Sequence, residues 1–379
     1  MQIAFFSNAY KPAISGVVTS IARFRKGLQA RGHQVHIFAP EYETFVDDEP
    51  YIFRFPALDL TEQLNVSLVM PIRNLMWPAV RGVKPALIHS QHPVLMGDIA
   101  AAFARQLKVP LVFTFHTQYE KYAQFYSPIG GRLAGLVTEE MVDRYLSHCD
   151  HVIVPTDSVR EMVEDEFGLT EQVSVVPTPV DLEAFEGLDP TPVRERYVPG
   201  ESKLLLYVGR IAKEKGLNFL LGAFGQIVSQ RPDVNLLMVG TGPQLDEFKA
   251  RTRKEGLAEK VFFAGAVSPD EVPAYYAAAD LFVFTSSSET QGLVLIEAMA
   301  AGTPVVAVRA PGPQDVLAEG GGRLVSADSS AFSDEVLALL NSPDEREKLA
   351  AEARQAVRRY GIPNAAEQLL DAYQRALDK

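Results

Sequence analysis

Glu289 and Glu297 stand eight residues apart in the stretch SSETQGLVLIEAMAAGTPVVA, and their surroundings suit ligand binding. The apolar run Leu281–Phe284 before them predicts a buried strand, and Gly292–Ala301 predicts a helix. Glu289 is then expected in the turn at the carboxyl end of the strand. Glu297 falls about a turn and a half into the helix, on the side that can face this turn. Carboxylates in these two places can accept hydrogen bonds from hydroxyl groups.

The start of the expected helix lies between the two glutamates and offers hydrogen-bond donors. The first backbone amides of a helix have no partner within it and carry a partial positive charge, so an anionic phosphate can bind there. Here these amides belong to Gln291, Gly292 and Leu293. A phosphate in the middle with hydroxyls at both ends describes a nucleotide sugar. The alternative is a pair of solvated surface glutamates around an ordinary turn.

This stretch resembles the E-x7-E signature of the retaining glycosyltransferases of family 4, which have the two-domain GT-B fold. Its variant Glu289-Thr290-Gln291-Gly292-Leu293 is similar to the one in bacterial diacylglycerol glycosyltransferases. The resemblance covers nearly the whole chain. It implies that Glu289 takes part in the reaction and that Glu297 and residues 290–293 bind the donor.

Two basic residues follow the expected strand Leu204–Val208, within the sequence GRIAKEKG. Arg210 offers a forked donor and Lys215 a point charge, which together suit a pyrophosphate. With Gly209 they match the family's G-R-x-x-x-x-K-G element, which holds the donor diphosphate. The chain contains no Asp-x-Asp sequence, so we expect these charges to neutralise the departing nucleoside diphosphate without a metal ion or another cofactor.

Three glycines follow other expected strands. Gly240 and Gly242 could be mistaken for a dinucleotide fingerprint, but Leu245 stands where the third glycine would be. By resemblance these two glycines line the nucleoside end of the donor site. Gly16 opens the first long helix, and the resemblance implies that its loop faces the donor phosphates.

Histidines also stand at expected strand ends. His116 follows Leu111–Phe115 and is either structural or a polar contact of the reacting sugar. In the family the matching histidine contacts the transferred hexose. We treat it as catalytic without making it a general base, because the leaving phosphate is thought to help take the proton. His92 either touches the acceptor or is structural. The cluster His148–His151 straddles a helix end and a strand start, so its side chains should diverge and no zinc site is expected.

The acceptor side is expected around Trp77, the only tryptophan of the chain. It lies among apolar residues with Arg73, Arg81 and Lys84 nearby, a mixture that suits an anionic membrane surface. The alternative is a core helix with basic ends. The sequence HTQY, ending in Tyr119, resembles the diacylglycerol subgroup, and we include Tyr119 on the acceptor side.

The composition is that of a globular protein of more than one domain. The 379 residues exceed what one core normally organises, and 47% of them are hydrophobic. A net charge of −12 argues against nucleic acid as a partner. One cysteine, Cys149, fits a reducing cytosol. Neither a signal peptide nor a long apolar window is visible, so we expect a cytoplasmic protein, peripheral on the inner face of the membrane.

Short apolar strands alternate with helices along the chain. The first series of strands is expected at Gln2–Phe6, Val35–Ala39, Leu87–Ser90, Leu111–Phe115, Val152–Val154 and Val173–Val176. The second series is expected at Leu204–Val208, Asn235–Val239, Val261–Phe263, Leu281–Phe284 and Pro304–Ala307. Helices are expected between them, for example at Val17–Arg31, Asp98–Leu107, Leu217–Ser229 and Gln244–Glu255. This alternation predicts an α/β protein with two Rossmann-like doubly wound domains that face each other across a cleft.

The prolines of the sequence PTPVD mark the change from one series to the other. We expect an acceptor-binding domain over residues 1–177, a connector over 178–200 and a nucleotide-sugar-binding domain over 201–360. The amphipathic helix within residues 361–379 either packs on its own domain or, as the resemblance implies, crosses back to the first one.

The function predicted from the sequence is retaining transfer of a hexose from UDP-glucose or UDP-galactose to a lipid, with diacylglycerol as the expected acceptor. The alternatives are transfer to an inositol phospholipid or a soluble sugar, and a sugar-nucleotide epimerase of the same fold. The E-x7-E spacing together with Arg210 and Lys215 favours transfer. A two-lobed sugar-binding protein would be expected to carry a signal peptide.

Overall fold

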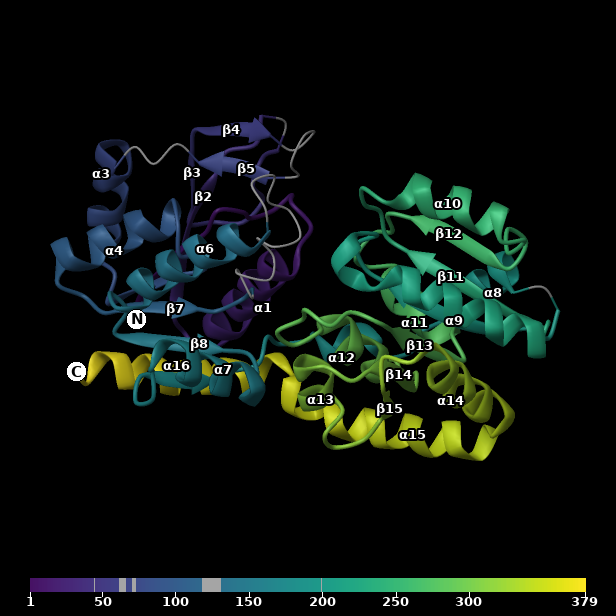
Figure 1. The fold of residues 1–379 in the computed structure, drawn as a ribbon. Helices are drawn as coiled ribbons and strands as arrows, with labels where there is room; N and C mark the ends of the chain where they lie inside the picture. Colours follow the sequence, from purple (N-terminus) through teal and green to yellow (C-terminus); the bar gives the residue numbers. More distant parts are fainter. Residues whose placement is uncertain (44, 61–65, 70–72, 118–130, 199) are drawn as a thin grey trace. The chain divides into compact units, whose positions relative to one another are not determined.

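A computed structural model describes residues 1–43, 45–60, 66–69, 73–117, 131–198 and 200–379. Contacts divide the chain into two compact units (Figure 1). The first unit comprises Met1–Pro179 and Ile362–Lys379, and the second comprises Val180–Gly361. Each unit is built on its own sheet.

The first unit has a sheet in which all neighbouring strands are parallel, in the order β3-β2-β1-β6-β7-β8-β9. The strand order reverses between β1 and β6, which creates a switch point there. A separate antiparallel pair is formed by β4 (Ala57–Leu60) and β5 (Val66–Val69). The sheet strands are β1 (Gln2–Phe6), β2 (Gln34–Pro40), β3 (Ile52–Phe55), β6 (Leu87–Ser90), β7 (Leu111–Thr114), β8 (His151–Val154) and β9 (Val173–Val175).

Helices cover both faces of this sheet, because consecutive apolar residues of a strand point to opposite faces. Phe5 belongs to a core cluster shared with α1 (Gly16–Ala30) and α16 (Ile362–Leu377). Phe6 belongs to the opposite cluster, to which four further helices contribute. These are α3 (Arg73–Val83), α4 (Met96–Leu107), α6 (Gly131–Leu146) and α7 (Asp157–Phe167).

The second unit has a parallel sheet in the order β12-β11-β10-β13-β14-β15. Its order reverses between β10 and β13. The strands are β10 (Lys203–Val208), β11 (Val234–Val239), β12 (Val261–Gly265), β13 (Leu281–Phe284), β14 (Val305–Val308) and β15 (Gly322–Val325).

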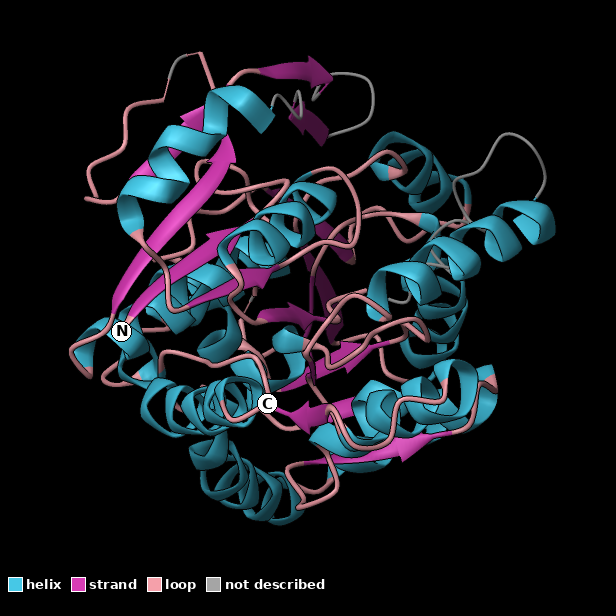
Figure 2. Ribbon diagram, turned by 90° about the vertical axis from the view of Figure 1, so that its left-hand side faces the viewer, coloured by secondary structure: helices cyan, strands magenta, loops and turns pink. Residues whose placement is uncertain are grey.

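Helices cover the second sheet on both faces as well. Figure 2 colours the helices and strands of the chain by type. One core cluster includes residues of α9 (Leu217–Gln230), α10 (Leu245–Lys254) and α14 (Ser329–Asn341). The other includes residues of α8 (Thr191–Tyr197), α11 (Val272–Ala278), α12 (Leu293–Ala300), α13 (Pro311–Val316), α15 (Pro343–Ala356) and the 3-10 turn η3 (Val357–Tyr360). Two further 3-10 turns are η1 (Leu182–Phe185) and η2 (Lys213–Lys215).

The predicted fold class is confirmed: two parallel-sheet α/β domains are present. The expected connector over residues 178–200 contains a helix. Helix α8 forms there, and its Val193 and Tyr197 are buried in the second unit. Pro192 lies in the first turn of α8, where its missing N–H has no partner to lose.

Candidate functional site

The second unit gathers its candidate residues at the carboxyl ends of β11, β10 and β13, three neighbouring strands. Gly209 and Arg210 follow β10 directly, and Lys215 ends the turn η2. Glu289 lies in the loop after β13, and Gly240 follows β11. These loops meet at the switch point of the sheet, the place where parallel α/β sheets bind ligands.

Lys215 and Glu289 form an ion pair in this group. Lys215 Nζ donates to Glu289 Oε1 over 2.5 Å, and both side chains are largely buried. Burial by itself lowers the pKa of Lys215, but the charge of Glu289, its hydrogen bond and the charge of Glu214 outweigh burial and Arg210, so the pKa is raised. Lys215 is therefore a permanent cation held at the end of the sheet, which suits an anionic ligand.

The turn that carries Lys215 is fixed to the end of β13 by two hydrogen bonds and by a close approach of the two backbones. Thr285 Oγ1 donates to the carbonyl oxygen of Lys215 over 3.0 Å, and Ser286 Oγ donates to that of Glu214 over 3.2 Å. A Cβ atom on Gly216, at φ +66°, would lie 2.3 Å from the carbonyl oxygen of Thr285. Sequence reasoning missed Thr285 and Ser286, because their partners lie some 70 residues earlier.

Gly240 and Gly242 have a structural reason to be glycine. A Cβ atom on Gly240, at φ +129°, would lie 2.1 Å from the carbonyl oxygen of Gly209. One on Gly242 would lie 2.3 Å from the carbonyl oxygen of Ile211. These glycines let the loops after β10 and β11 pack backbone against backbone. Their contact with a nucleoside stays a prediction.

Glu297 lies in α12, which begins at Leu293, one residue later than expected. Gly292 precedes the helix in a left-handed conformation, with φ +86°. The fully buried Tyr276 of α11 donates its hydroxyl to Glu297 Oε2 over 3.2 Å. Tyr276 thus orients the carboxylate. Sequence reasoning missed this tyrosine, because the two residues belong to different elements.

Thr290 and Gln291 complete the loop between β13 and α12. Gln291 is 3% exposed. A Cβ atom on Gly312 would lie 2.9 Å from the carbonyl oxygen of Glu289 and 3.1 Å from that of Gln291. The start of α13 therefore packs closely against the backbone of this loop, and this contact limits the movement of the loop.

The first unit holds a second polar group, at the switch point between β1 and β6. His116 Nε2 and Gln91 Oε1 are 2.8 Å apart, and the backbone N–H of Asn8 donates to His92 Nδ1 over 3.2 Å. Burial lowers the pKa of His92 to about 4. Burial, and then the neighbouring His92, lowers the pKa of His116 to about 3. Both rings are therefore neutral at pH 7, which agrees with a hydrogen-bonding role for His116.

His89 lies one step deeper in the sheet and is structural. Its Nδ1 is 2.7 Å from the hydroxyl of Tyr373 in α16, and its Nε2 is 2.7 Å from Thr114 Oγ1. Gly16 is exposed at the start of α1, where Ser15 Oγ caps the helix by accepting from the N–H of Val18. The structure thus places Gly16 at a helix N-terminus, as expected.

The acceptor-side residues lie on α3 or just after it. Trp77 is half-buried, and its ring lies 5.5 Å from that of Phe103, so it packs against the core. Arg73 donates to Gln106 Oε1 over 2.8 Å. Leu75 is the exposed large apolar residue of α3, with 51% of its surface accessible.

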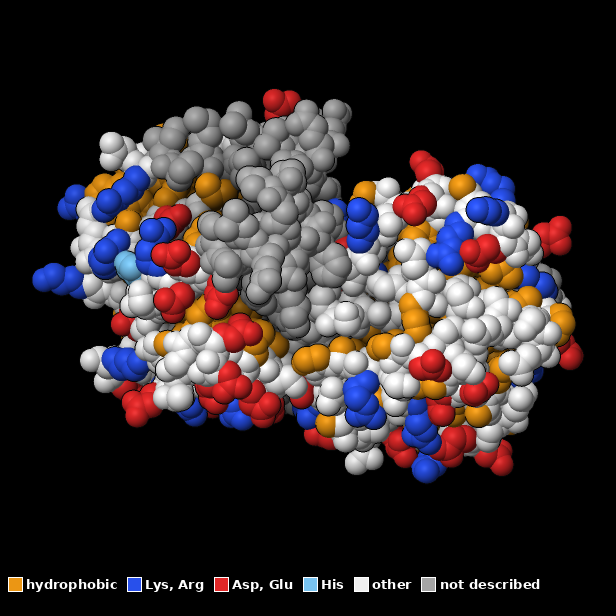
Figure 3. All heavy atoms as spheres, viewed as in Figure 1, with side chains coloured by type: hydrophobic (Ala, Val, Ile, Leu, Met, Phe, Trp, Pro, Cys, Tyr) orange, Lys and Arg blue, Asp and Glu red, His pale blue; other side chains and the backbone are white. Residues whose placement is uncertain are grey.

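The exposed face of α3 is basic. Arg81 and Lys84 are exposed, as is Arg73. In Figure 3, Lys and Arg side chains lie beside apolar ones at the edge of the first unit where Figure 1 shows α3. Tyr119 lies outside the residues that the structure describes. Of the described helices, none combines the length and the apolar character needed to cross a bilayer.

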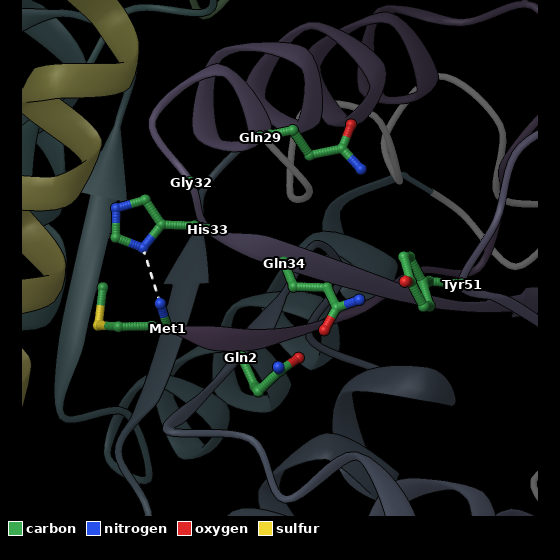
Figure 4. Close-up of a pocket in the computed structure, with 7 residues that line it drawn as sticks. All are labelled: Met1, Gln2, Gln29, Gly32, His33, Gln34 and Tyr51. Carbon is green, nitrogen blue, oxygen red and sulfur yellow. Dashed lines mark hydrogen bonds between the residues drawn. The ribbon is translucent and has the colours of Figure 1, made fainter.

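A pocket of about 540 Å³ lies elsewhere in the first unit (Figure 4). It is at the opposite end of the sheet from the switch-point residues, where strands begin, and the Met1 amino group lies 3.1 Å from His33 Nδ1 beside it. Since ligands of parallel sheets bind at carboxyl ends, we do not assign the reaction to this pocket. Its lining residues are Met1, Gln2, Gln29, Gly32, His33, Gln34 and Tyr51.

The cluster His148–His151 does not converge. His148 Nδ1 is 2.7 Å from the carbonyl oxygen of Arg144, whereas His151 Nε2 is 2.8 Å from Ser174 Oγ. Within the described ranges, no three His, Cys, Asp or Glu side chains are grouped as metal ligands would be.

Comparison with known proteins relates both units of the chain to glycosyltransferases. Residues 14–184 match the family model Glycosyltransferase Family 4, and residues 193–356 match Glycosyl transferases group 1. Sucrose-phosphate synthase of Thermosynechococcus elongatus has the same fold, with a TM-score of 0.83 and 21% identity over 99% of this chain and 98% of that one. HepE of Anabaena in complex with UDP has a TM-score of 0.75 at 21% identity, over 98% and 99% of the two chains. The fold is therefore that of the GT-B glycosyltransferases.

Relatives of known activity indicate which glycosyltransferases the chain resembles in sequence. Alpha-monoglucosyldiacylglycerol synthase of Streptococcus pneumoniae is 31% identical over 316 residues, which are 81% of this chain and 71% of that protein. The enzyme of the same name from Acholeplasma laidlawii is 28% identical over 81% and 80% of the two chains. A GDP-mannose-dependent alpha-mannosyltransferase of Corynebacterium glutamicum is 29% identical over 84% and 75%. The chain belongs to glycosyltransferase family 4.

Proposed function

We propose that this glycosyltransferase moves a hexose from UDP-glucose or UDP-galactose to diacylglycerol at a membrane surface, with retention of the anomeric configuration. The proposal of a nucleotide-sugar donor rests on one observation, the ion pair between Lys215 and Glu289 at the switch point of the second unit. The acceptor half is supported by the likeness to two alpha-monoglucosyldiacylglycerol synthases. The UDP bound by a protein of the same fold is in keeping with a uridine donor.

In the proposed reaction the second unit binds the donor. Arg210 and Lys215 hold the diphosphate, Glu297 accepts from ribose hydroxyls and Glu289 accepts from the hexose. His116 of the first unit is assigned a hydrogen bond with a sugar hydroxyl. The bond from C1 to the phosphate oxygen breaks, and a bond from C1 to the acceptor oxygen forms on the same face. The leaving phosphate takes the acceptor's proton, and the two basic side chains stabilise the negative charge that it gains.

A second candidate acceptor is a soluble molecule, because the chain is also similar to a D-inositol 3-phosphate glycosyltransferase of Corynebacterium urealyticum. The likeness to the GDP-mannose-dependent mannosyltransferase makes GDP-mannose a candidate donor as well. The exposed basic face of α3, with Leu75, favours a lipid surface over a soluble acceptor.

The test is an incubation of the protein with UDP-glucose, UDP-galactose or GDP-mannose. Each donor is paired with diacylglycerol in mixed micelles or with a panel of water-soluble sugars and inositol phosphates. We expect a hexosyl-diacylglycerol by mass, with the α-anomer by NMR and full activity in EDTA. Glycosylation of a water-soluble acceptor alone would overturn the lipid assignment. Loss of activity in EDTA that magnesium restores would overturn metal independence.

A further inference from the structure

The pocket drawn in Figure 4 has the lining of a site for an uncharged ligand that forms hydrogen bonds. Its volume of about 540 Å³ lies in the range of small-molecule sites. Three of its described lining residues are glutamines, Gln2, Gln29 and Gln34, and none has the side chain of a lysine, an arginine or an acid. Burial lowers the pKa of His33, so this ring is neutral at pH 7. Apart from the amino group of Met1, the lining therefore offers polar groups without charge.

Tyr51 brings an aromatic ring to this pocket. The residue is 45% exposed, and its ring lies 5.1 Å from that of His36 in an edge-to-face arrangement. Its backbone has φ +64°, in the left-handed region that a tyrosine adopts only at a cost in free energy. Such a conformation persists where the surrounding structure fixes it, and it is common at ligand sites. Here Arg25 donates to the carbonyl oxygen of Pro50, and the N–H of Ile37 donates to that of Tyr51.

Amide side chains reach the pocket from α1 and from two neighbouring strands. Gln2 and Gln34 are partners in the register of β1 and β2, so their side chains lie next to each other on one face of the sheet. Gln2 Oε1 accepts from His36 Nε2 over 2.6 Å, because an amide oxygen has no hydrogen to donate. The amide nitrogen of Gln2 is therefore the end that can donate to a ligand. Figure 4 shows the amides of Gln29 and Gln34 extending towards the side of the pocket where the Tyr51 ring lies.

A sugar ring matches this combination of groups. Its hydroxyls both donate and accept, as amides do, and its C–H face packs against an aromatic ring. A divalent metal ion would find no carboxylate among the described lining residues. We propose that this pocket is a second carbohydrate site, which binds a neutral hexose unit through Tyr51 and the three glutamines. The hexose is bound without reaction, at the end of the first sheet opposite the switch point, either as a free sugar or as the headgroup of a glycolipid.

NMR titration of the full chain with methyl α-glucoside or methyl α-galactoside, in an excess of UDP, tests the site without turnover. The side-chain amide signals of the three glutamines and the ring signals of Tyr51 should shift. Tyr51→Gly removes the ring, and glycine adopts this φ without strain, so the fold should be kept while affinity falls about tenfold. Tyr51→Phe keeps the ring and should keep most of the affinity. Gln29→Ala should weaken binding about fivefold, whereas Gln368→Ala, the same change on an exposed residue of α16, should not weaken it.

Vesicles distinguish a free sugar from a lipid headgroup. If the headgroup binds, glucosyl-diacylglycerol in phosphatidylcholine vesicles should increase flotation of wild type and not of Tyr51→Gly. Equal flotation of the two, with the glycoside still bound in solution, assigns the site to a free sugar. The proposal is overturned if no glycoside shifts these signals, if the shifts are confined to residues at the switch point, or if Tyr51→Gly and Gln29→Ala bind as wild type does. Because the titration needs no turnover, a wild type that transfers no hexose contradicts the proposed function alone.

Discussion

The ammonium group of Lys215 is held in one position by its neighbours, and it is also the charge proposed to stabilise the leaving diphosphate. Its charge is held by Glu289 at 2.5 Å, and the turn around it is tied to β13 by hydrogen bonds from Thr285 and Ser286. A cation that needs no rearrangement stabilises charge in a transition state more than one that must be brought in. The pair is therefore suited to a leaving diphosphate, because its geometry exists before the substrate binds.

We predict that Lys215→Ala lowers kcat by about 100-fold and changes KM much less, because the diphosphate gains charge as it leaves. Lys215→Arg, which keeps the charge, should recover part of the loss. Steady-state kinetics with the donor found active makes the comparison. A rise in KM at unchanged kcat would mean that Lys215 binds the ground state and the transition state equally well.

Glu297→Ala should weaken binding of UDP by about 1.5–3 kcal/mol, since a carboxylate that accepts from two ribose hydroxyls makes charge-assisted hydrogen bonds. Tyr276→Phe removes only the hydroxyl that orients Glu297, so its effect should be smaller. Titration calorimetry with UDP measures both. If Tyr276→Phe weakens binding as much as Glu297→Ala does, then the tyrosine contributes more than orientation.

At the scale of elements, the central strands could be predicted and several edge strands could not. Leu281–Phe284 is a continuous apolar run because parallel strands are buried on both faces. By contrast, β3 has the sequence IFRF and is mostly half-buried, with Arg54 paired to Asp47. Strand β15 begins at Gly322, directly after two further glycines, and none of its residues is fully buried. The apolar pattern is weak where burial is weak.

The same reasoning explains which site residues could be found. Glu289, Lys215 and His116 follow strands closely in the sequence, so the alternation of strands and helices is enough to predict that they lie at a sheet end. Tyr276 and Gln91 contact Glu297 and His116, which belong to other parts of the fold. Such pairings depend on strand order and register, which the sequence pattern does not contain.

The last helix, α16, carries Tyr373, whose hydroxyl lies 2.7 Å from Nδ1 of His89 in the first sheet, and both side chains are buried. Tyr373→Phe removes the hydroxyl and leaves a ring nitrogen of His89 without a partner in the core. The free energy of unfolding of the first unit should fall by about 1–3 kcal/mol. Urea unfolding measures the change, with Gln374→Ala on the exposed side of α16 as the control. An unchanged midpoint for Tyr373→Phe would show that His89 finds another partner.

At the scale of the whole molecule, both units are organised alike. In each, polar residues follow the two strands that flank the reversal in strand order, β1 and β6 in the first sheet and β10 and β13 in the second. The strand order cannot be predicted from the sequence. The position of the polar residues can, because ligands of a parallel sheet are expected at the carboxyl ends of its strands wherever helices alternate with strands. The donor residues could therefore be predicted better than the acceptor residues, whose identity depends on loops and on a surface.

Membrane docking is the prediction that belongs to the whole molecule, since a chain of net charge −12 should be repelled by anionic lipid unless a local surface is basic. Arg73, Arg81 and Lys84 provide such a surface on α3 and just after it, and Leu75 is its exposed apolar residue. We expect binding to anionic liposomes in low salt that fades as salt rises, at about 1 kcal/mol per basic residue.

The structure separates the roles of Leu75 and Trp77. Leu75→Ser should weaken flotation with liposomes at unchanged stability, because the side chain is exposed. Trp77→Ala should instead lower the free energy of unfolding, because the ring packs against Phe103. Arg81→Ala should weaken flotation as Leu75→Ser does, and UDP affinity should stay intact in all three variants, because the proposed donor residues belong to the second unit. Wild type that does not float at any salt concentration, together with efficient transfer to a water-soluble sugar, would make α3 a core helix with a basic exposed side and no docking role.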